Sequence, residues 1–150
     1  MESLDEPQTK KPDCPDAPIA PPGVSVDQNI KSAQSKRNEF GLINQASNLM
    51  NSMPWFYNQV RSRGPWDYKR SGSQYENFGN FNYGATGAAM GIPESALLRG
   101  AGWASTHADS SRSAFWGNWW GSAPYGDDPA DQAQIKAGID YYKAKSGGCK

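Results

Sequence analysis

Residues 128–148 read DPADQAQIKAGIDYYKAKSGG and contain the signals of a complete α-helix. Asp128 has the side chain of an N-cap, Pro129 suits the first helical position, and Asp131 places a carboxylate in the first turn. Three apolar side chains then recur on one face of the helix: Ile135, Ile139 and Tyr142. Because a glycine pair follows, the pattern predicts a helix over residues 129–145.

Helix signals also precede this segment, and they are clearer than any strand signal. Pro93 and Glu94 open a run whose apolar side chains fall on one side, which predicts a helix over residues 93–107. Pro54 is expected to open a shorter helix that ends before Gly64.

The other segments are less regular. Residues 26–50 predict one or two further helices with a break near Gly41. Residues 79–91 contain four glycines and fit either a tightly packed helix or a loop dominated by its backbone. Since no segment alternates with a period of two, we expect a mainly α fold. It would be a single compact helical domain with an aromatic-rich core and long Gly-rich loops, preceded by a disordered Pro-rich tail.

The composition changes near the N-terminus. Six of the eleven prolines and none of the aromatic residues fall in residues 1–23, so this stretch is expected to be a disordered linker. Seventeen of the eighteen aromatic residues lie between Trp55 and Tyr142. We therefore expect a folded domain over residues 24–145 and a flexible tail over residues 146–150.

The overall composition excludes several classes of protein. Fifteen Lys and Arg balance fifteen Asp and Glu over 150 residues, which excludes a uniformly basic nucleic-acid coat. No apolar run reaches the roughly 18–20 residues of a transmembrane segment, and the N-terminus has acids where a signal peptide has a basic start. Within residues 31–70, seven bases face two acids. This local cationic face could attract a polyanion, while a solvated helix face is the simpler interpretation.

The cysteines and the single histidine restrict the chemistry. Cys14 and Cys149 lie near opposite ends and are expected to be free thiols, with a disulfide in an oxidising compartment as the alternative. His107 has no second histidine to work with, which excludes a two-histidine ribonuclease mechanism. A surface or capping role is expected for it, with a lone proton carrier as the alternative.

Residues 64–69, GPWDYK, are the first block that could carry chemistry. Asp67 and Lys69 have the spacing by which some metal nucleases place a metal-binding acid and a transition-state lysine. The alternative is a plain surface ion pair, with Trp66 and Tyr68 in the core.

Residues 75–87, YENFGNFNYGATG, form a second block. Glycine between aromatic residues lets the backbone approach a ligand closely, and Asn80 and Asn82 could supply directed hydrogen bonds. Glu76 has aromatic neighbours in the sequence, and apolar surroundings suit a general acid. The alternative is that the asparagines satisfy turns and Glu76 caps a helix.

A third block, PYGDDPAD at residues 124–131, contains three carboxylates that could bind a hard cation. Two of them are already explained as helix-start residues, which leaves only Asp127 without a structural role. The preceding stretch FWGNWWG, residues 115–121, offers rings that could stack on sugars or nucleobases, although such rings are often simply part of a core.

Five blocks in this order resemble the polymorphic toxin type 44 family, over about residues 24–143. The blocks that carry the resemblance are WFYNQV at 55–60, GPWDYK at 64–69, YE and FGNFNYGATG within 75–87, LLR and AGWA within 97–104, and PYGDDP at 124–129. The family consists of bacterial toxin domains at the C-terminal end of larger secreted or contact-delivered proteins, including type VI secretion tip and Rhs-type carriers.

The resemblance implies a toxin that is secreted or delivered into a target bacterial cell. It implies three partners: a cognate immunity protein, a larger delivery or carrier protein, and a polymeric substrate in the target cell. The Pro-rich start would be what remains of a tether to the delivery module. A hydrolase that acts on nucleic acid by general acid–base chemistry is the expected activity, and a divalent cation stays open as a cofactor.

The candidate site residues lie inside or beside these blocks. Those expected in catalysis are Asp67, Lys69, Glu76, Asn82 and Asp127. Those expected to bind substrate are Arg61, Arg63, Trp66, Asn80, Tyr83 and Trp119.

Three activities fit these residues. In a nuclease, Lys69 would stabilise phosphate charge, the two arginines would guide the backbone, and Asp67 or Glu76 would act as base or metal ligand. In a hydrolase of peptidoglycan or another glycan in the target periplasm, Glu76 would protonate the leaving oxygen and Asp127 would be the second carboxylate. The third activity is a toxin that acts without turnover, by binding the envelope or a carbohydrate.

Overall fold

The computed structural model describes residues 13–41, 48–108 and 114–149, and within these ranges the chain forms helices and no strand. The α-helices are α1 (Val26–Gly41), α2 (Asn48–Val60), α3 (Glu76–Ala89), α4 (Glu94–Ala108) and α5 (Pro129–Ser146). Short 3-10 helices are η2 (Tyr68–Ser71), η3 (Ser73–Tyr75) and η4 (Ala114–Trp116). The mainly α fold class is therefore as expected.

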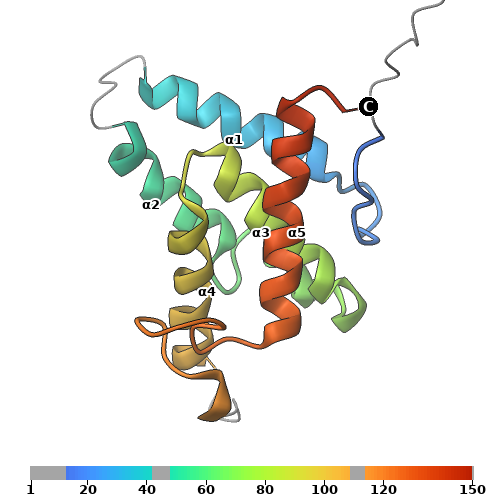
Figure 1. Cartoon of the computed structure of the whole chain (residues 1–150). Helices are drawn as coiled ribbons and strands as arrows, with labels where there is room; N and C mark the ends of the chain where they lie inside the picture. Colours follow the sequence, from blue (N-terminus) through green and yellow to red (C-terminus); the bar gives the residue numbers. More distant parts are fainter. Residues whose placement is uncertain (1–12, 42–47, 109–113, 150) are drawn as a thin grey trace, which may run out of the picture.

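Helices α3 and α5 form the centre of the molecule and pack on each other more extensively than any other pair (Figure 1). Glycine permits this approach, because a Cβ atom on Gly84 would collide with the carbonyl oxygen of Ile135. In the same way, a Cβ atom on Gly138 would collide with the carbonyl oxygen of Phe81. Helix α1 lies across one end of this pair, and α2 and α4 lie to one side of it (Figure 1).

The glycine-rich stretch 79–91 is mainly helix, since α3 continues to Ala89. Its glycines face neighbouring helices, and a Cβ atom on Gly87 would collide with the side chain of Leu97. The low helix propensity of glycine is thus outweighed by tertiary packing. Of the two interpretations left open by the sequence, the tightly packed helix is the one that forms.

The two clearest helix predictions are confirmed. The segment predicted over residues 129–145 is α5, and the Asp128 side chain caps it by accepting a 2.8 Å hydrogen bond from the N–H of Ala130. The segment predicted over residues 93–107 is α4. The break expected near Gly41 falls at the edge of residues 42–47, which lie outside the described residues.

The prediction for Pro54 is wrong in one respect. Helix α2 begins at Asn48, so Pro54 lies inside the helix and not at its start. A proline in a helix interior lacks the N–H of one helical hydrogen bond, which is a local cost. Phe56, on the following turn, is only 3% exposed, and burial of this ring in the core offsets that cost.

The core mixes aliphatic and aromatic side chains. Its buried residues are Val26, Ile30, Ala33, Phe56, Tyr68, Phe78, Phe81, Ala85, Ala89, Met90, Ile92, Leu97, Ile135, Ile139 and Tyr141. The rings of the described residues contact each other in separate pairs, such as Phe81 with Tyr141 and Tyr68 with Phe78. Other rings, including Trp103 and Trp120, are exposed. The aromatic residues therefore divide between the interior and the surface.

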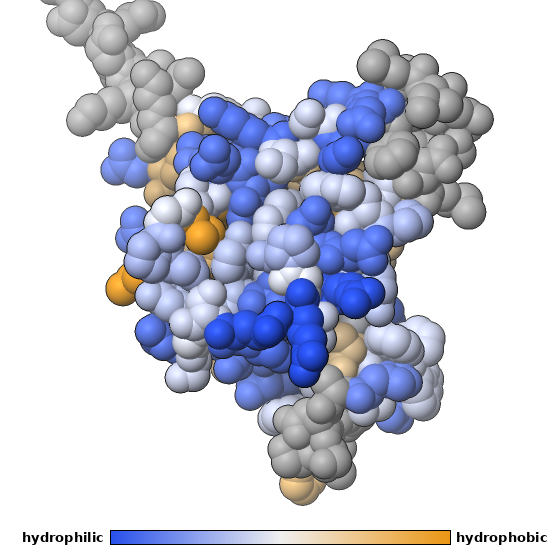
Figure 2. Space-filling view, turned by 180° about the vertical axis from the view of Figure 1, so that it is seen from behind, coloured by the Kyte–Doolittle hydropathy of each residue, from blue (hydrophilic) through white to orange (hydrophobic). Residues whose placement is uncertain are grey.

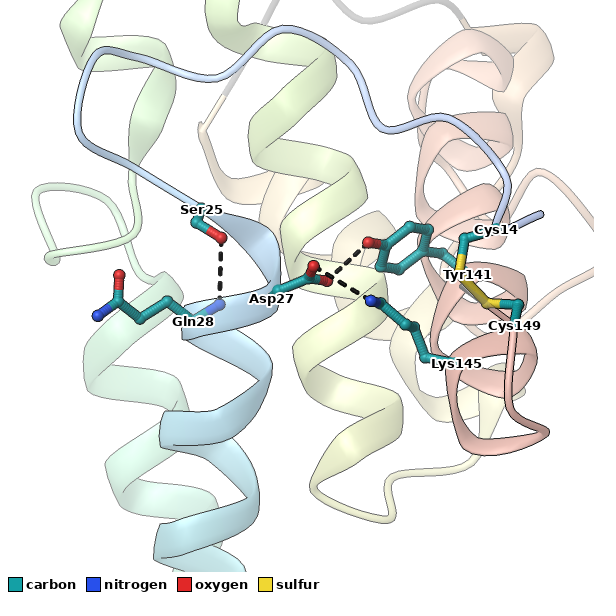
Figure 3. A network of polar contacts seen from close by, with 7 residues as sticks. All are labelled: Cys14, Ser25, Asp27, Gln28, Tyr141, Lys145 and Cys149. Carbon is teal, nitrogen blue, oxygen red and sulfur yellow. Dashed lines mark hydrogen bonds and ion pairs between the residues drawn. A yellow bond between two sulfur atoms is a disulfide. The ribbon is translucent and has the colours of Figure 1, made fainter. Parts of the chain in front are cut away.

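The expectation of free thiols is wrong, because Cys14 and Cys149 form a disulfide whose Cα atoms lie 5.0 Å apart (Figure 3). The reason lies in the path of the chain before α1. This segment crosses to the C-terminal end of α5, and Cys14, Ala20 and Val24 pack against the core. The two cysteines, which are 135 positions apart in the sequence, thus meet.

A segment that spans a bilayer requires a long apolar stretch. Among the helices described, none carries an apolar stretch long enough to cross a bilayer. The face turned away from the view of Figure 1 is hydrophilic over most of its area, and its hydrophobic residues are isolated (Figure 2). That face offers no broad apolar patch.

Candidate active site

A pair of carboxyl groups lies where α3 and α5 begin. Glu76 is the first residue of α3, and Asp131 lies in the first turn of α5. The two side chains hydrogen-bond to each other. A hydrogen bond between two carboxyl groups needs a proton, so this contact favours the protonated form of Asp131.

The surroundings keep this proton in place near neutral pH. The pKa of Asp131 is raised to about 7, first because burial disfavours its charged form and then because of its hydrogen bond with Glu76. The neighbouring negative charges act in the same direction: those of Glu76, Asp127 and Asp128. An acid with a pKa near the working pH is suited to general acid catalysis.

Asp127 lies beside the pair and is only 5% exposed. Its Oδ2 accepts a 2.9 Å hydrogen bond from Nε2 of Gln132, and it also hydrogen-bonds with Ser105 and the backbone of Asp128. Burial nevertheless raises the pKa of Asp127, because the loss of hydration outweighs these hydrogen bonds. Asp127 is therefore a fixed acidic group behind the pair.

Gln132 connects Asp127 to helix α4. It is buried, and its Nε2 also donates to the carbonyl oxygen of Leu98 at 3.2 Å. One amide group therefore connects the carboxylate of Asp127 to the backbone of α4. Gln132 is not among the predicted residues, because an isolated glutamine in a helix carries no signal of this role.

The loop before Asp127 is held by Arg99 of α4. The Arg99 guanidinium donates to the carbonyl oxygens of Trp119 at 3.0 Å and Gly121 at 2.8 Å, and it lies over the ring of Tyr125 at 4.6 Å. The rings of Trp119 and Trp120 contact each other edge to face and remain exposed. The loop therefore presents exposed tryptophans from a segment that leads directly into the acidic cluster.

Two predicted residues point into the protein interior. Asn82 is fully buried, and its Oδ1 accepts a 2.9 Å hydrogen bond from Asn29 of α1. The Tyr83 hydroxyl donates to the carbonyl oxygen of Leu97 at 2.7 Å, and burial together with the charge of Asp127 raises its pKa. Both side chains thus connect α3 to neighbouring helices.

The residues of the first block form a turn. Oδ2 of Asp67 accepts a 2.8 Å hydrogen bond from the N–H of Arg63, and the Trp66 ring packs edge to face on Trp55. Lys69 is exposed on η2. Asp67 therefore holds the turn together through its hydrogen bond with the backbone of Arg63. The spacing of Asp67 and Lys69 in the sequence does not predict this role.

Several other predicted residues lie at or near the surface. Arg61 is exposed, as is Arg63. Nδ2 of Asn80 donates to the carbonyl oxygen of Glu76 at 3.3 Å, within the first turns of α3. His107, for which a surface role was expected, is exposed and stacks on Trp103, with Nδ1 lying 2.8 Å from the Trp103 carbonyl oxygen.

A metal centre would need several ligand side chains that lie close together. Over the part of the chain that the structure describes, no group of three or more His, Cys, Asp or Glu side chains could hold a metal ion.

Two members of the cluster, Glu76 and Asp127, are among the residues predicted from the sequence, whereas Asp131 is not. The position of Asp131 at a helix start gave it an adequate explanation, and its contact with α3 is visible only in three dimensions.

Comparison with known proteins gives one match. A family model described as bacterial toxin 44 matches residues 67–144, which include α3, α4 and most of α5 and therefore the whole carboxyl cluster. No curated protein and no solved structure matches the chain.

Proposed function

The chain belongs to the bacterial toxin 44 family, and from this premise we propose that it hydrolyses a glycan of the target bacterium by general acid–base catalysis. The carboxyl pair of Glu76 and Asp131 is the proton donor. The observation that carries the proposal is the position of Asp131, which lies partly buried beside the carboxyl groups of Glu76 and Asp127 and whose pKa is thereby raised to about 7.

The proposed reaction begins when the pair protonates the glycosidic oxygen of the leaving group. Positive charge then develops on the sugar ring, and the negative charge of Asp127 stabilises it through space. Water adds to the ring and returns a proton to the pair. Because hydrogen-bonded carboxyl groups lie closer together than the acid and nucleophile of glycosidases, Glu76 and Asp131 act as one donor and not as two separate catalysts.

Two features support a glycan over a polyanion. The negative charges of Glu76, Asp127 and Asp128 all act on Asp131, and a site of this charge repels a phosphate backbone. The exposed rings of Trp119 and Trp120 stand on the loop that enters the cluster, where they could stack on sugar rings.

Hydrolysis of nucleic acid is the second candidate, and one observation favours it. The basic side chains around η2 are all exposed: Arg61, Arg63, Lys69 and Arg70. In this alternative Lys69 would stabilise phosphate charge, the two arginines would guide the backbone, and the same carboxyl pair would protonate the leaving oxygen.

To test the proposal, the purified chain is incubated separately with peptidoglycan sacculi, RNA and DNA. The soluble products released from each polymer are then measured. Glu76→Gln and Asp131→Asn should each reduce glycan release by about 100-fold or more, because each removes one carboxyl group of the pair. Asp140→Asn is the matched control, since it makes the same chemical change at an exposed position of α5.

Three other outcomes would contradict the proposal. Loss of RNA or DNA together with inactivation by Lys69→Ala would establish the second candidate. Full glycan release by both carboxyl variants would remove the catalytic role of the pair. Toxicity without degradation of any polymer would indicate a toxin that acts by binding.

We also propose, from the family resemblance, how the toxin is delivered and controlled. A larger carrier protein would bring the domain into the target cell, by type VI secretion or a related contact-dependent route. A cognate immunity protein would bind it in the producing cell. Co-expression of the toxin with the gene beside it should restore growth if that gene encodes the immunity protein.

A further inference from the structure

The segment before α1 is fixed to the end of α5 by the Cys14–Cys149 disulfide (Figure 3). Cys149 follows α5 closely, and its N–H donates to the carbonyl oxygen of Ala144 at 3.0 Å. Cys149 is buried and Cys14 is half-buried. The disulfide therefore joins two ends of the described chain at one place on the helical body.

A polar network lies beside the disulfide. The Tyr141 hydroxyl donates to Oδ1 of Asp27 at 2.6 Å, and Nζ of Lys145 lies 3.2 Å from Oδ2 of the same carboxylate (Figure 3). These contacts join the first turn of α1 to the last turns of α5. The ion pair is partly exposed and by itself contributes little to stability.

The segment itself has few other attachments. Among the described residues, no hydrogen bond or ion pair connects residues 13–20 to the helices. Its apolar contacts are made by Cys14 and Ala20, which are only partly buried. Without the disulfide, the order of this segment would rest on two small side chains, which do not offset the conformational entropy of eight residues.

We propose that the Cys14–Cys149 disulfide is a clamp that closes only in an oxidising compartment, so that the toxin works in the envelope of its target and not in the cytoplasm. Cytoplasmic thiols are kept reduced, whereas the bacterial periplasm maintains disulfides. The part of the proposal that concerns the substrate rests on the proposed function, and it names the cell-wall glycan as the polymer that this compartment offers.

The closing step has a defined chemistry. A thiolate of one cysteine attacks the disulfide of a periplasmic thiol oxidoreductase and forms a mixed disulfide. The second cysteine then attacks this intermediate and releases the oxidoreductase as a dithiol. The toxin gives up two protons and two electrons in total, and the oxidoreductase disulfide accepts both electrons.

The first test measures the clamp without any activity assay. Full-length chain is melted with and without dithiothreitol, alongside the Cys14→Ser/Cys149→Ser double variant. Because the disulfide closes a loop of 135 residues, reduction should lower the Tm of the wild type by about 10 °C. The double variant should match the reduced wild type and should not respond to dithiothreitol. Equal Tm values for all samples would overturn the clamp.

The second test places the chain in two compartments of a sensitive bacterium. Exported wild type should reduce viable counts by at least about 100-fold, retained wild type should not, and the exported double cysteine variant should kill about 10-fold less than the exported wild type. Killing by the retained wild type equal to that by the exported wild type would overturn the compartment assignment.

The two proposals fail in different ways. If exported Glu76→Gln kills as well as the wild type, the hydrolytic function fails, while the Tm difference between oxidised and reduced chain still supports the clamp. If Glu76→Gln is inactive but dithiothreitol leaves the Tm unchanged, the clamp fails and the hydrolytic function stands.

Discussion

The carboxyl group of Asp131, in the first turn of α5, hydrogen-bonds with that of Glu76 at the first residue of α3. Both positions lie at helix N-termini, where the helix dipole favours a negative charge. The pKa of Asp131 is nevertheless raised to about 7. Burial and the neighbouring carboxylates therefore outweigh the two helix dipoles, and the site retains a proton where an isolated aspartate would have lost it.

The first prediction concerns the pH dependence of activity. If the pair donates a proton, hydrolysis requires its protonated form, so the rate should fall as the pH rises through about 7, the pKa of Asp131. The measurement is the initial rate of glycan release between pH 5 and pH 9. A rate that stays level or increases over this range would show that the proton of Asp131 is not used.

The second prediction concerns stability. Because the pKa of Asp131 is higher in the folded protein than in the unfolded chain, the folded state binds the proton more tightly between about pH 4 and pH 7. This contribution to stability is fully present below about pH 4 and is lost as the pH rises to about 7. Asp131→Asn removes the titrating group and should be more stable than the wild type at pH 8.

Thermal melting of the wild type and Asp131→Asn at pH 5 and pH 8 tests the direction in which stability changes with pH. The Tm of the wild type should fall relative to that of the variant on going from pH 5 to pH 8. Asp140→Asn, at an exposed position of α5, should show no such change relative to the wild type. A constant Tm difference between wild type and Asp131→Asn would mean that Asp131 titrates normally.

The helices could be predicted from sequence where local signals agree with the final packing. The cap at Asp128 and the apolar face that follows it identify α5 without any tertiary information. Helix α3 could not be assigned in this way, because its glycines disfavour a helix locally and are explained only by the close approach of Ile135 and Leu97. Pro54 was misplaced for the same reason, since burial of Phe56 is not a local property.

The residues of the candidate site could also be predicted only in part from the sequence. Glu76 and Asp127 could be selected from residue type and neighbours in the sequence. The partner of Glu76 could not, because Asp131 lies 55 positions later and is brought to it by the crossing of α3 and α5. The disulfide was kept only as an alternative because both cysteines lie in stretches without helix signals.

The third prediction tests how Asp127 is held. Gln132→Ala removes the donor to Oδ2 of Asp127 and to the carbonyl oxygen of Leu98, so a buried carboxylate and a carbonyl lose a partner. We expect a loss of about 1–3 kcal/mol in the free energy of unfolding, measured with urea. Gln134→Ala, on the same helix and half-buried without a hydrogen bond among the described residues, should cost far less. Equal losses would assign the effect to helix propensity.

The fourth prediction concerns the close contact between α3 and α5, on which the candidate site depends. Gly84→Ala would place a methyl group against the carbonyl oxygen of Ile135, and backbone on both sides leaves no side chain that could move away. We expect a loss of at least about 3 kcal/mol in the free energy of unfolding, measured with urea, or no folded protein.

Gly79→Ala is the matched control on α3: its new methyl group would lie 3.8 Å from the Tyr68 side chain, an ordinary contact. Since alanine favours a helix over glycine by about 1 kcal/mol, the control should be neutral or stabilising. If both variants were equally stable, α3 and α5 would be farther apart than the structure places them, and the contact between Glu76 and Asp131 would lose its support.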